Sequence, residues 1–289
     1  MPRAWLIAGA GGMLGTALQR VLVARGERLE APPEGSFDIT DEGVVARVVH
    51  GFAAGLEPGT EGVLVNAAAY TDVERAEDEP EVAQLVNGRA PRLLAEVARD
   101  AGLRFVHVST DFVFDGTKSG AYTEEDAPNP LSVYGRSKLD GERGVLEADS
   151  DALVARAAWA FGPAGVNFPV KILAAARTRP ALKVVTDEVG SPTYTLDLAA
   201  GIVGLVEAGA SGLYNLVGSG ACSRFELAAE TLRLAGVDTP LEPVTSDAFP
   251  TRAARPANSV LDCAKAARSG VTMRDWHDSL ADFVLGDLG

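Results

Sequence analysis

Short apolar runs alternate with longer amphipathic segments through the first half of the chain. Residues 4–8, 62–65, 104–109 and 152–155 have the length and composition of buried strands, and a weaker strand is expected at 28–31. Between them, apolar residues recur at helical spacing after Gly15, after Asp41, over 80–101 and over 132–146. Repeated strand-helix alternation with short connections predicts a parallel sheet that is covered by helices on both faces.

From residue 156 onward this alternation weakens. Helices are predicted near 168–177, from Asp197 and over 224–235 with Ser223 as cap, and strands at 182–185 and 213–216. We therefore predict an α/β protein: a doubly wound parallel sheet with a smaller mixed α/β lobe on the C-terminal side. Residues 1–158 are assigned to the sheet domain, with strand and helix contributions returning at about 182–210. Residues 159–289 are assigned mainly to the lobe.

Composition narrows the possible partners. The 289 residues carry 26 Lys and Arg against 40 Asp and Glu, a formal net charge of −14, which argues against nucleic acid as a ligand. The apolar runs are too short to span a membrane, and the first residues lack a secretory leader pattern. The two cysteines, Cys222 and Cys263, have no metal or redox spacing. We expect a soluble cytoplasmic protein without a membrane or nucleic-acid partner and without a metal.

A glycine-rich turn follows the first strand. In "GAGGMLG", Gly9, Gly12 and Gly15 stand three residues apart between an apolar strand and an amphipathic helix. Glycines allow the backbone to approach a phosphate, and the helix N-terminus offers free N–H groups and partial positive charge. This combination predicts that the sheet domain is a dinucleotide-binding, Rossmann-type domain. The second strand has no clear ribose-reading residue, so NAD and NADP are not separated.

Three further features near strand ends are ambiguous. The alanines at 67–69 would leave room for a flat cofactor, but they could also begin a helix. Asp38 could lie near an adenine or serve only as a turn residue. Asn87, inside a predicted helix, could bond to the neighbouring strand segment or face solvent. Because the glycine turn, residues 67–70 and residues 110–111 all follow strand ends, they should share one rim of the sheet.

A hydroxyl and a Tyr/Lys pair are the candidate chemistry. Thr110 and Asp111 follow a buried strand, and Tyr134 and Lys138 lie four residues apart on the next helix, hence on one face. A nearby cation favours the phenolate, so Lys138 is expected to lower the pKa of Tyr134 and make it a general acid or base. A proton donor to a carbonyl oxygen is useful mainly beside a hydride source. The alternative is an exposed helix pair without function.

Arginines in a Pro-rich loop are a second candidate group. Arg252 and Arg255 lie in "PTRAARPANSVLD", and guanidinium groups match phosphate oxygens bidentately. They could cradle a diphosphate, or they could simply be solvated. His107 is expected to be a packed strand residue and not a ligand.

These motifs resemble, in order and over nearly the whole chain, the extended short-chain dehydrogenase/reductases, and within them the dTDP-4-dehydrorhamnose reductase branch. The stretches that carry the resemblance include "VNAAAYTDVERAEDEPEVAQLVN", "VSTDFVFDG", "YGRSK", "RAAWAFG" and "GSPTYTLDLA". The resemblance implies that Thr110, Tyr134 and Lys138 are catalytic. It implies a cofactor site at Gly9, Gly12, Met13, Leu14, Gly15, Asp38, Ile39, Ala67, Ala68, Ala69, Tyr70, Thr71, Tyr134 and Lys138. It implies substrate contacts at Thr110, Asp111, Trp159, Asn167 and Arg255.

The activity implied by the resemblance is hydride transfer from NADPH or NADH to C4 of a dTDP-4-keto-6-deoxyhexose, most often to give dTDP-L-rhamnose. Two alternatives remain: reduction of another dTDP-deoxysugar, including a branched sugar aldehyde in antibiotic assembly, or a non-catalytic, cofactor-binding regulatory role. The intact Thr110, Tyr134 and Lys138 argue against the last. Some relatives form a dimer bridged by Mg²⁺ through an acidic residue on the first helix. Thr16, Ala17 and Leu18 stand there in this chain, so a monomer or a homodimer without a metal bridge is expected.

Overall fold

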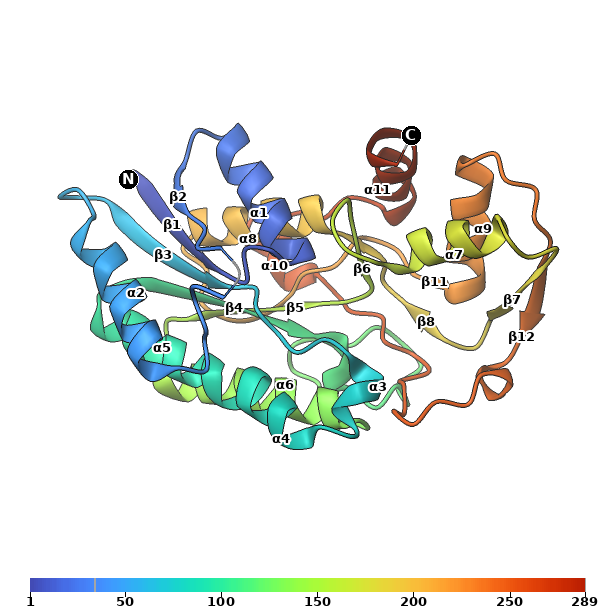
Figure 1. The fold of residues 1–289 in the computed structure, drawn as a ribbon, viewed down its shortest axis with the longest axis horizontal. Coiled ribbons are helices and arrows are strands. Elements are labelled where there is room, and N and C mark those ends of the chain that lie inside the picture. The colour runs from blue at the N-terminus through green and yellow to red at the C-terminus, as the bar shows by residue number, and fades with distance from the viewer. Residues whose placement is uncertain (34, 289) are drawn as a thin grey trace.

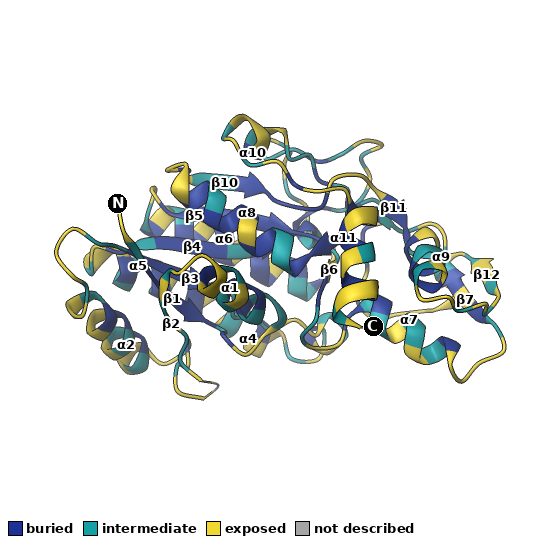
Figure 2. Ribbon diagram, turned by 90° about the horizontal axis from the view of Figure 1, so that it is seen from above, coloured by how far each residue is buried: buried dark blue, intermediate teal, exposed yellow. Residues whose placement is uncertain are grey.

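The computed structural model describes residues 1–33 and 35–288, and its centre is a six-stranded parallel sheet of order β10-β5-β4-β3-β1-β2 (Figure 1). The strands are β1 (Arg3–Ala8), β2 (Arg28–Glu30), β3 (Glu61–Asn66), β4 (Arg104–Thr110), β5 (Leu153–Ala157) and β10 (Gly212–Asn215). The predicted doubly wound α/β fold is confirmed. Figure 2 shows that the central strands are almost entirely buried, whereas the outer faces of the helices are exposed.

Helices cover both faces of the sheet. Side chains of each strand point alternately to opposite sides, and the apolar ones on each side pack against a helix layer. Trp5 and Ile7 of β1 belong to the core under one helix layer, and Ala4 and Leu6 to the core under the other. The first layer contains α1 (Met13–Ala24), α8 (Thr195–Glu207) and α10 (Ala264–Arg268). The second contains α2 (Glu42–Ala54), α5 (Ala90–Asp100) and α6 (Val133–Ala148) (Figure 1).

The carboxyl ends of β1, β3 and β4 lie at one edge of the sheet. Ala8 pairs in parallel with Asn66, which pairs with His107 three residues before the end of β4. The glycine turn, residues 67–70 and residues 110–111 therefore share one rim, as predicted. His107 is fully buried, and its Nδ1 lies 3.2 Å from Asn66 Nδ2, as expected for a packed strand residue.

A smaller lobe lies beyond this rim (Figure 1). Its sheets have two strands each: β7 pairs with β12, β8 with β11 and β6 with β9. Its strands are β6 (Ala160–Phe161), β7 (Leu182–Val185), β8 (Val189–Gly190), β9 (Thr193–Tyr194), β11 (Cys222–Ser223) and β12 (Leu241–Val244). Its helices are α7 (Phe168–Ala176), α9 (Arg224–Leu234), η3 (Ser246–Ala248), α11 (Trp276–Asp282) and η4 (Phe283–Asp287).

The boundary between sheet domain and lobe differs from the prediction at the returning segment. The expected return at about 182–210 includes β7, but β7 pairs with β12 outside the main sheet. The elements that rejoin the sheet domain are α8, which packs against α1, β10, which pairs with β5, and α10, which packs on β10. Length and apolarity alone do not distinguish a strand of the main sheet from a strand of the lobe. The assignment of residues 182–185 to the sheet domain is therefore wrong.

The helix predicted over 80–101 is divided into three parts. It consists of α4 (Pro80–Ala83), the π-helical segment η1 (Gln84–Arg89) and α5, and it follows the single turn of α3 (Val73–Ala76). A π-helix has wider turns than an α-helix, so its side chains are rotated relative to those of a regular helix. Short π-helical segments are frequent at functional sites. Within the described part of the chain, no helix combines the length and the apolarity needed to cross a bilayer.

Candidate active site

Thr110 and Asp111 lie where β4 ends. Thr110 Oγ1 donates to Asp111 Oδ1 at 2.9 Å and accepts from the Phe112 N–H at 3.2 Å, so it caps η2 (Asp111–Val113). Asp111 is 2% exposed. Burial raises the pKa of its carboxyl to about 6, although the hydroxyls of Ser259 and Thr110 and the charge of Arg224 oppose the shift. The sheet thus delivers a paired hydroxyl and carboxyl to the rim.

Tyr134 is brought beside them by the start of α6. Ser132 caps this helix by accepting from the Gly135 N–H at 3.1 Å. A side chain at Gly135 would place its Cβ 2.3 Å from the Phe112 carbonyl oxygen, so the helix can pack directly on η2 only with glycine there. Tyr134 is half-buried, and desolvation of its phenol raises the pKa to about 12, while the neighbouring Thr110 hydroxyl lowers that pKa and the charge of Asp111 raises it.

Lys138, one turn later, is 2% exposed, and its Nζ donates to the Val108 carbonyl at 2.6 Å. Burial lowers the pKa of its ammonium to about 8, while Glu142 raises it. The expectation that Lys138 lowers the pKa of Tyr134 is wrong for this structure, because burial dominates the phenol and the ammonium is directed to β4. Tyr134 therefore stays protonated at neutral pH, as an ordinary tyrosine does.

The glycine turn has the shape that a dinucleotide phosphate needs. Gly9 has a φ of 78°, and a Cβ there would lie 2.5 Å from the backbone nitrogen of Ala68. A Cβ at Gly15 would lie 2.2 Å from the Gly9 carbonyl oxygen, so the turn packs directly on α1. Gly12 is the N-cap of α1 and offers no side-chain cap, and Gly11 and Gly12 are exposed. Uncapped N–H groups at an open helix start fit a pyrophosphate, and Met13 and Leu14 are half-buried there.

The segment after β3 is held by Asn87 of η1. Asn87 Oδ1 accepts from the Tyr70 N–H at 2.8 Å, and Asn87 Nδ2 donates to the Tyr70 carbonyl at 3.0 Å and to Ser137 Oγ at 3.1 Å. Asn87 is buried, so of the two hypotheses it bonds to the strand segment and does not face solvent. Ala67, Ala68 and Ala69 are half-buried at the rim and do not begin a helix; Thr71 is exposed.

Asp38 and Ile39 have clear structural roles before α2. Asp38 is exposed, and its Oδ1 accepts from the Thr40 N–H at 2.9 Å and from Thr40 Oγ1 at 2.7 Å. These bonds hold the pKa of Asp38 below its usual value. Ile39 is buried in the core beside α2. Asp38 thus serves as a turn residue in this structure. Contact of Asp38 and Ile39 with an adenine stays a prediction.

On the lobe side, the predicted substrate residues are already bonded to the protein. Asn167 caps α7 by accepting from the Val170 N–H at 3.2 Å, and its Nδ2 donates to the Gly162 carbonyl at 2.8 Å. Arg255 pairs with Glu74 at 2.6 Å, and Arg252 pairs with Asp78. The two arginines therefore face carboxylates of the segment after β3 instead of forming an open cradle.

Arg224 is a residue that the sequence analysis missed. Its guanidinium lies 3.4 Å from the ring centre of Trp159, which is also predicted to contact substrate, and its charge acts on Asp111. A signal was present in the sequence. Arg224 is the first residue of α9, where the helix dipole disfavours a cation, so an arginine there needs another reason.

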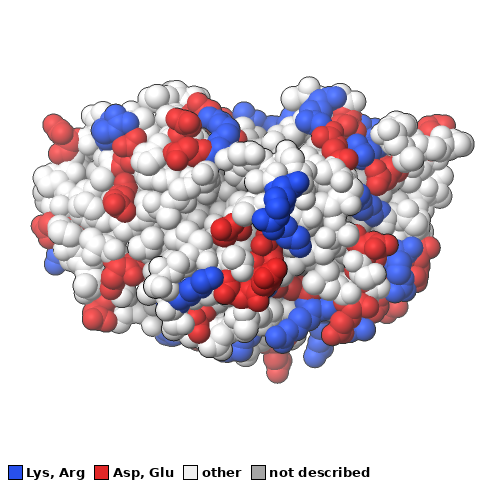
Figure 3. Space-filling view, turned by 180° about the vertical axis from the view of Figure 1, so that it is seen from behind, with Lys and Arg blue, Asp and Glu red and all other residues white. Residues whose placement is uncertain are grey.

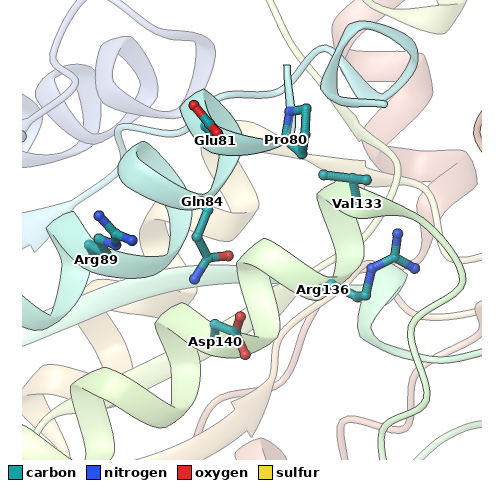
Figure 4. A pocket seen from close by; sticks show the side chains of 7 residues that line it. All are labelled: Pro80, Glu81, Gln84, Arg89, Val133, Arg136 and Asp140. Carbon is teal, nitrogen blue, oxygen red and sulfur yellow. The ribbon is translucent and has the colours of Figure 1, made fainter. Parts of the chain in front are cut away.

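One surface hollow lies outside this rim. A hollow of about 580 Å³ lies between α4, η1 and α6, and it is lined by Pro80, Glu81, Gln84, Arg89, Val133, Arg136 and Asp140 (Figure 4). Its α6 residues Arg136 and Asp140 are exposed, whereas Lys138 of the same helix is buried.

Acidic and basic side chains are interspersed on the face that Figure 3 shows. No cluster of His, Cys, Asp or Glu suited to a metal occurs within residues 1–33 and 35–288.

A doubly wound sheet, a glycine turn open at a helix start, and a Thr/Tyr/Lys set on the same rim define a nicotinamide-dependent reductase of the short-chain dehydrogenase/reductase type. The family model described as the RmlD substrate binding domain matches residues 3–286, and this chain belongs to that family. The protein is an NAD(P)H-dependent oxidoreductase.

Individual relatives agree over the full length. The dTDP-4-dehydrorhamnose reductase of Mycolicibacterium smegmatis is 40% identical, over 98% of this chain and 86% of the relative. The dTDP-4-keto-6-deoxy-D-glucose reductase of Streptomyces niveus is 39% identical, over 96% and 94%. A crystal structure of dTDP-4-dehydrorhamnose reductase from Bacillus anthracis in complex with NADP superposes with a TM-score of 0.92 at 31% identity, covering 99% of each chain.

Proposed function

We propose that this protein reduces the C4 keto group of a dTDP-4-keto-6-deoxyhexose, with dTDP-4-dehydro-L-rhamnose as substrate, dTDP-L-rhamnose as product and NADPH as reductant. The observation that carries the proposal is the packing of Tyr134, at the start of α6, against η2 directly after Thr110, on the rim that also holds the glycine turn. Full-length similarity to proteins named dTDP-4-dehydrorhamnose reductase supports the substrate, and the NADP complex of the Bacillus anthracis protein supports the cofactor.

The cofactor would lie between the glycine turn and the segment after β3. The N–H groups at Met13 and Leu14 would bind the pyrophosphate beside Gly12, whose own N–H donates to the Gly9 carbonyl at 3.1 Å. The small residues 67–69 would leave space beside the nicotinamide end. When bound, the reduced nicotinamide supplies the hydride. Asn87 fixes the segment 67–71 through the Tyr70 backbone, so the π-helical segment helps to hold this surface in place.

The protein's own part in the reaction is proton donation and alignment. With a pKa of about 12, Tyr134 keeps its proton at neutral pH and can give it to a keto oxygen that accumulates negative charge. Thr110, whose Oγ1 donates to Asp111 Oδ1 in this structure, would hold that oxygen by turning its proton from Asp111 to the substrate. Lys138 supplies a buried positive charge beneath the site. Trp159 would contact the sugar, and Asn167 and Arg255 the diphosphate end.

A second substrate is favoured by one particular relative. The Streptomyces niveus protein, 39% identical over nearly its whole length, is named a dTDP-4-keto-6-deoxy-D-glucose reductase. Such a substrate would use the same proton donor and differ in the orientation of the ring. The experiment that separates the two candidates is an assay of NADPH oxidation with each dTDP-4-keto sugar, followed by NMR of the product at C4. Lack of turnover with all of them would reject the proposed function.

A further inference from the structure

Glu77 connects the segment after β3 with the helix that carries Tyr134. It follows the single turn of α3 and is half-buried, and its Oε1 accepts from the Val133 N–H at 2.8 Å. Val133 is the first residue of α6 and lies 56 positions later in the chain. An N–H in the first turn of a helix has no partner within the helix, and a carboxylate there also meets the favourable end of the helix dipole. Glu77 is therefore a second cap of α6, supplied by a distant segment.

The backbone of Tyr134 lies between two capped amides. On one side, Ser132 Oγ accepts from the Gly135 N–H at 3.1 Å. On the other side, Glu77 accepts from the Val133 N–H. The two acceptors come from different parts of the chain, and each fixes one neighbour of Tyr134. A change in the position of the helix start would therefore move the phenol with it.

The ring of Tyr134 packs against η2, the turn that follows Thr110. The rings of Phe112 and Tyr134 meet edge to face, with their centres 5.5 Å apart and their planes at 79°. The backbones are equally close, because a Cβ at Gly135 would lie 2.3 Å from the Phe112 carbonyl oxygen. Contacts this close leave little freedom for the start of α6. The place of the phenol at the rim thus depends on how firmly the first turn of α6 is held.

The segment that carries Glu77 is itself anchored on the side of the lobe. Glu74 pairs with Arg255 at 2.6 Å and accepts from the Arg252 N–H at 3.0 Å. Asp78 pairs with the side chain of Arg252. Glu77 lies between Glu74 and Asp78 in the chain, and α3 packs against α6 on the other side (Figure 1). The carboxylate that caps α6 is thus held in place from both sides.

We propose that Glu77 is a positioning residue for the reduction: by holding the first turn of α6 it keeps the Tyr134 phenol against η2 at the rim. The inference rests on the proposed function. Glu77 acts through the Val133 backbone, so its effect should depend on the acceptor oxygen. Glu77→Gln keeps an acceptor oxygen at the same distance from the backbone, and Glu77→Ala removes it. Glu77→Asp keeps the charge but withdraws the acceptor by one methylene group.

The first test needs no activity. NMR of a protein labelled on its five tyrosines, with the Tyr134 signals assigned by their loss in Tyr134→Phe, reports the place of this ring beside Phe112, whose ring current shifts those signals. In Glu77→Ala we expect the Tyr134 signals to move and the Val133 amide hydrogen to exchange faster with solvent. Glu77→Gln should keep both near their parental values. Glu81→Ala, which removes an exposed carboxylate from the first turn of α4, is the control. Unmoved Tyr134 signals in Glu77→Ala overturn the proposal.

The second test is kinetic and uses the same variants. Misplacement of a reacting group lowers the rate of the chemical step, so the single-turnover rate of reduction should fall about ten- to hundredfold in Glu77→Ala at unchanged NADPH affinity. Glu77→Asp should also lose rate, so the outcome does not depend on the stability of the alanine variant. Glu77→Gln should retain most of the rate, and Glu81→Ala all of it.

A parental rate in Glu77→Ala and Glu77→Asp, with or without a lower free energy of unfolding, would mean that Glu77 serves the fold alone, which overturns the proposal. If no dTDP-keto sugar is reduced by the parent protein, the proposed function fails, while the NMR results still decide the role of Glu77.

Discussion

Tyr134 retains its proton more firmly in this protein than a free tyrosine does, since burial and the neighbouring Asp111 charge raise its pKa to about 12. The site therefore has two buried groups with opposite shifts: a phenol that resists ionisation and a lysine, Lys138, whose pKa falls to about 8. Both shifts have burial as their largest cause. At neutral pH both groups are protonated, so the phenol has a proton to give to the far more basic alkoxide that forms in the reduction.

The Lys138 shift gives a pH dependence with a definite sign. Because its folded-state pKa is lowered to about 8, the positive charge is present below pH 8 and is lost as the pH rises through that value. We expect kcat/KM for reduction to fall above about pH 8, while Tyr134 is still protonated. The measurement is the rate of NADPH oxidation from pH 6.5 to 10 at constant ionic strength. A constant rate across that range would remove the Lys138 charge from the mechanism.

At the scale of single elements, the glycine turn and the π-helical segment place the rim. The turn can approach residues 67–68 only because Gly9 has no side chain. Segment η1 directs the Asn87 amide onto Tyr70 and Ser137, and thereby joins three elements of the cofactor side. Neither the glycine turn nor η1 supplies a reacting group, but each fixes the backbone against which a cofactor would lie.

Gly9→Ala tests the turn. The added Cβ would meet the Ala68 nitrogen at 2.5 Å as well as adopting a φ of 78°, so we expect lost NADPH binding and a free energy of unfolding lowered by more than the ~1–2 kcal/mol typical of the left-handed backbone alone. Gly59→Ala is the matched control, since Gly59 has a φ of 81° in open space. Urea unfolding and NADPH titration measure both effects. Equal losses in the two variants would contradict the close packing.

Asn87→Ala tests the π-helical segment. It would leave the N–H and carbonyl of Tyr70 without their present partners, which is expected to cost about 1–3 kcal/mol of stability and to weaken NADPH binding because segment 67–71 loses its anchor. Arg92→Ala, on the exposed face of α5, should change neither quantity by more than about 0.5 kcal/mol. NADPH affinity equal to that of the parent protein would show that Asn87 serves the fold alone.

At the scale of the whole molecule, the two lobes meet across the rim. Glu74 and Asp78, in the segment after β3, pair with Arg255 and Arg252 of the loop that precedes α10. The predicted diphosphate arginines thus also join the lobe to the sheet domain. Substrate binding through Arg255 would have to share or replace its bond with Glu74, so closure of the site and recognition of the diphosphate are expected to be coupled.

Arg255→Gln should therefore raise the KM for the sugar nucleotide about tenfold, equivalent to ~1.4 kcal/mol, with little change in NADPH binding. Arg252→Gln is the control, because its ion pair is largely exposed and exposed pairs contribute at most about 1 kcal/mol. Initial-rate kinetics give both constants. If the two variants raise KM equally, Arg255 has no special contact with the diphosphate.

Much of this arrangement could be predicted from the sequence, for physical reasons. Apolar runs and helical spacing predicted the sheet and its helices. The positions of the strand ends predicted the shared rim, because the carboxyl ends of parallel strands lie at one edge of a sheet. Long-range features could not be predicted. The π-helical turns at Asn87, the bond from Lys138 to Val108, the pairing of β7 with β12 and the stacking of Arg224 on Trp159 depend on contacts between segments far apart in the chain.

The central claim is that the Tyr134 phenol delivers the proton to the substrate ketone. Single-turnover consumption of NADPH with dTDP-4-dehydro-L-rhamnose, compared between the parent protein and Tyr134→Phe, tests it most directly, with NADPH affinity measured separately by titration. The account predicts a rate lower by about 10²–10⁴ in Tyr134→Phe at unchanged NADPH affinity. A single-turnover rate equal to that of the parent protein would contradict it.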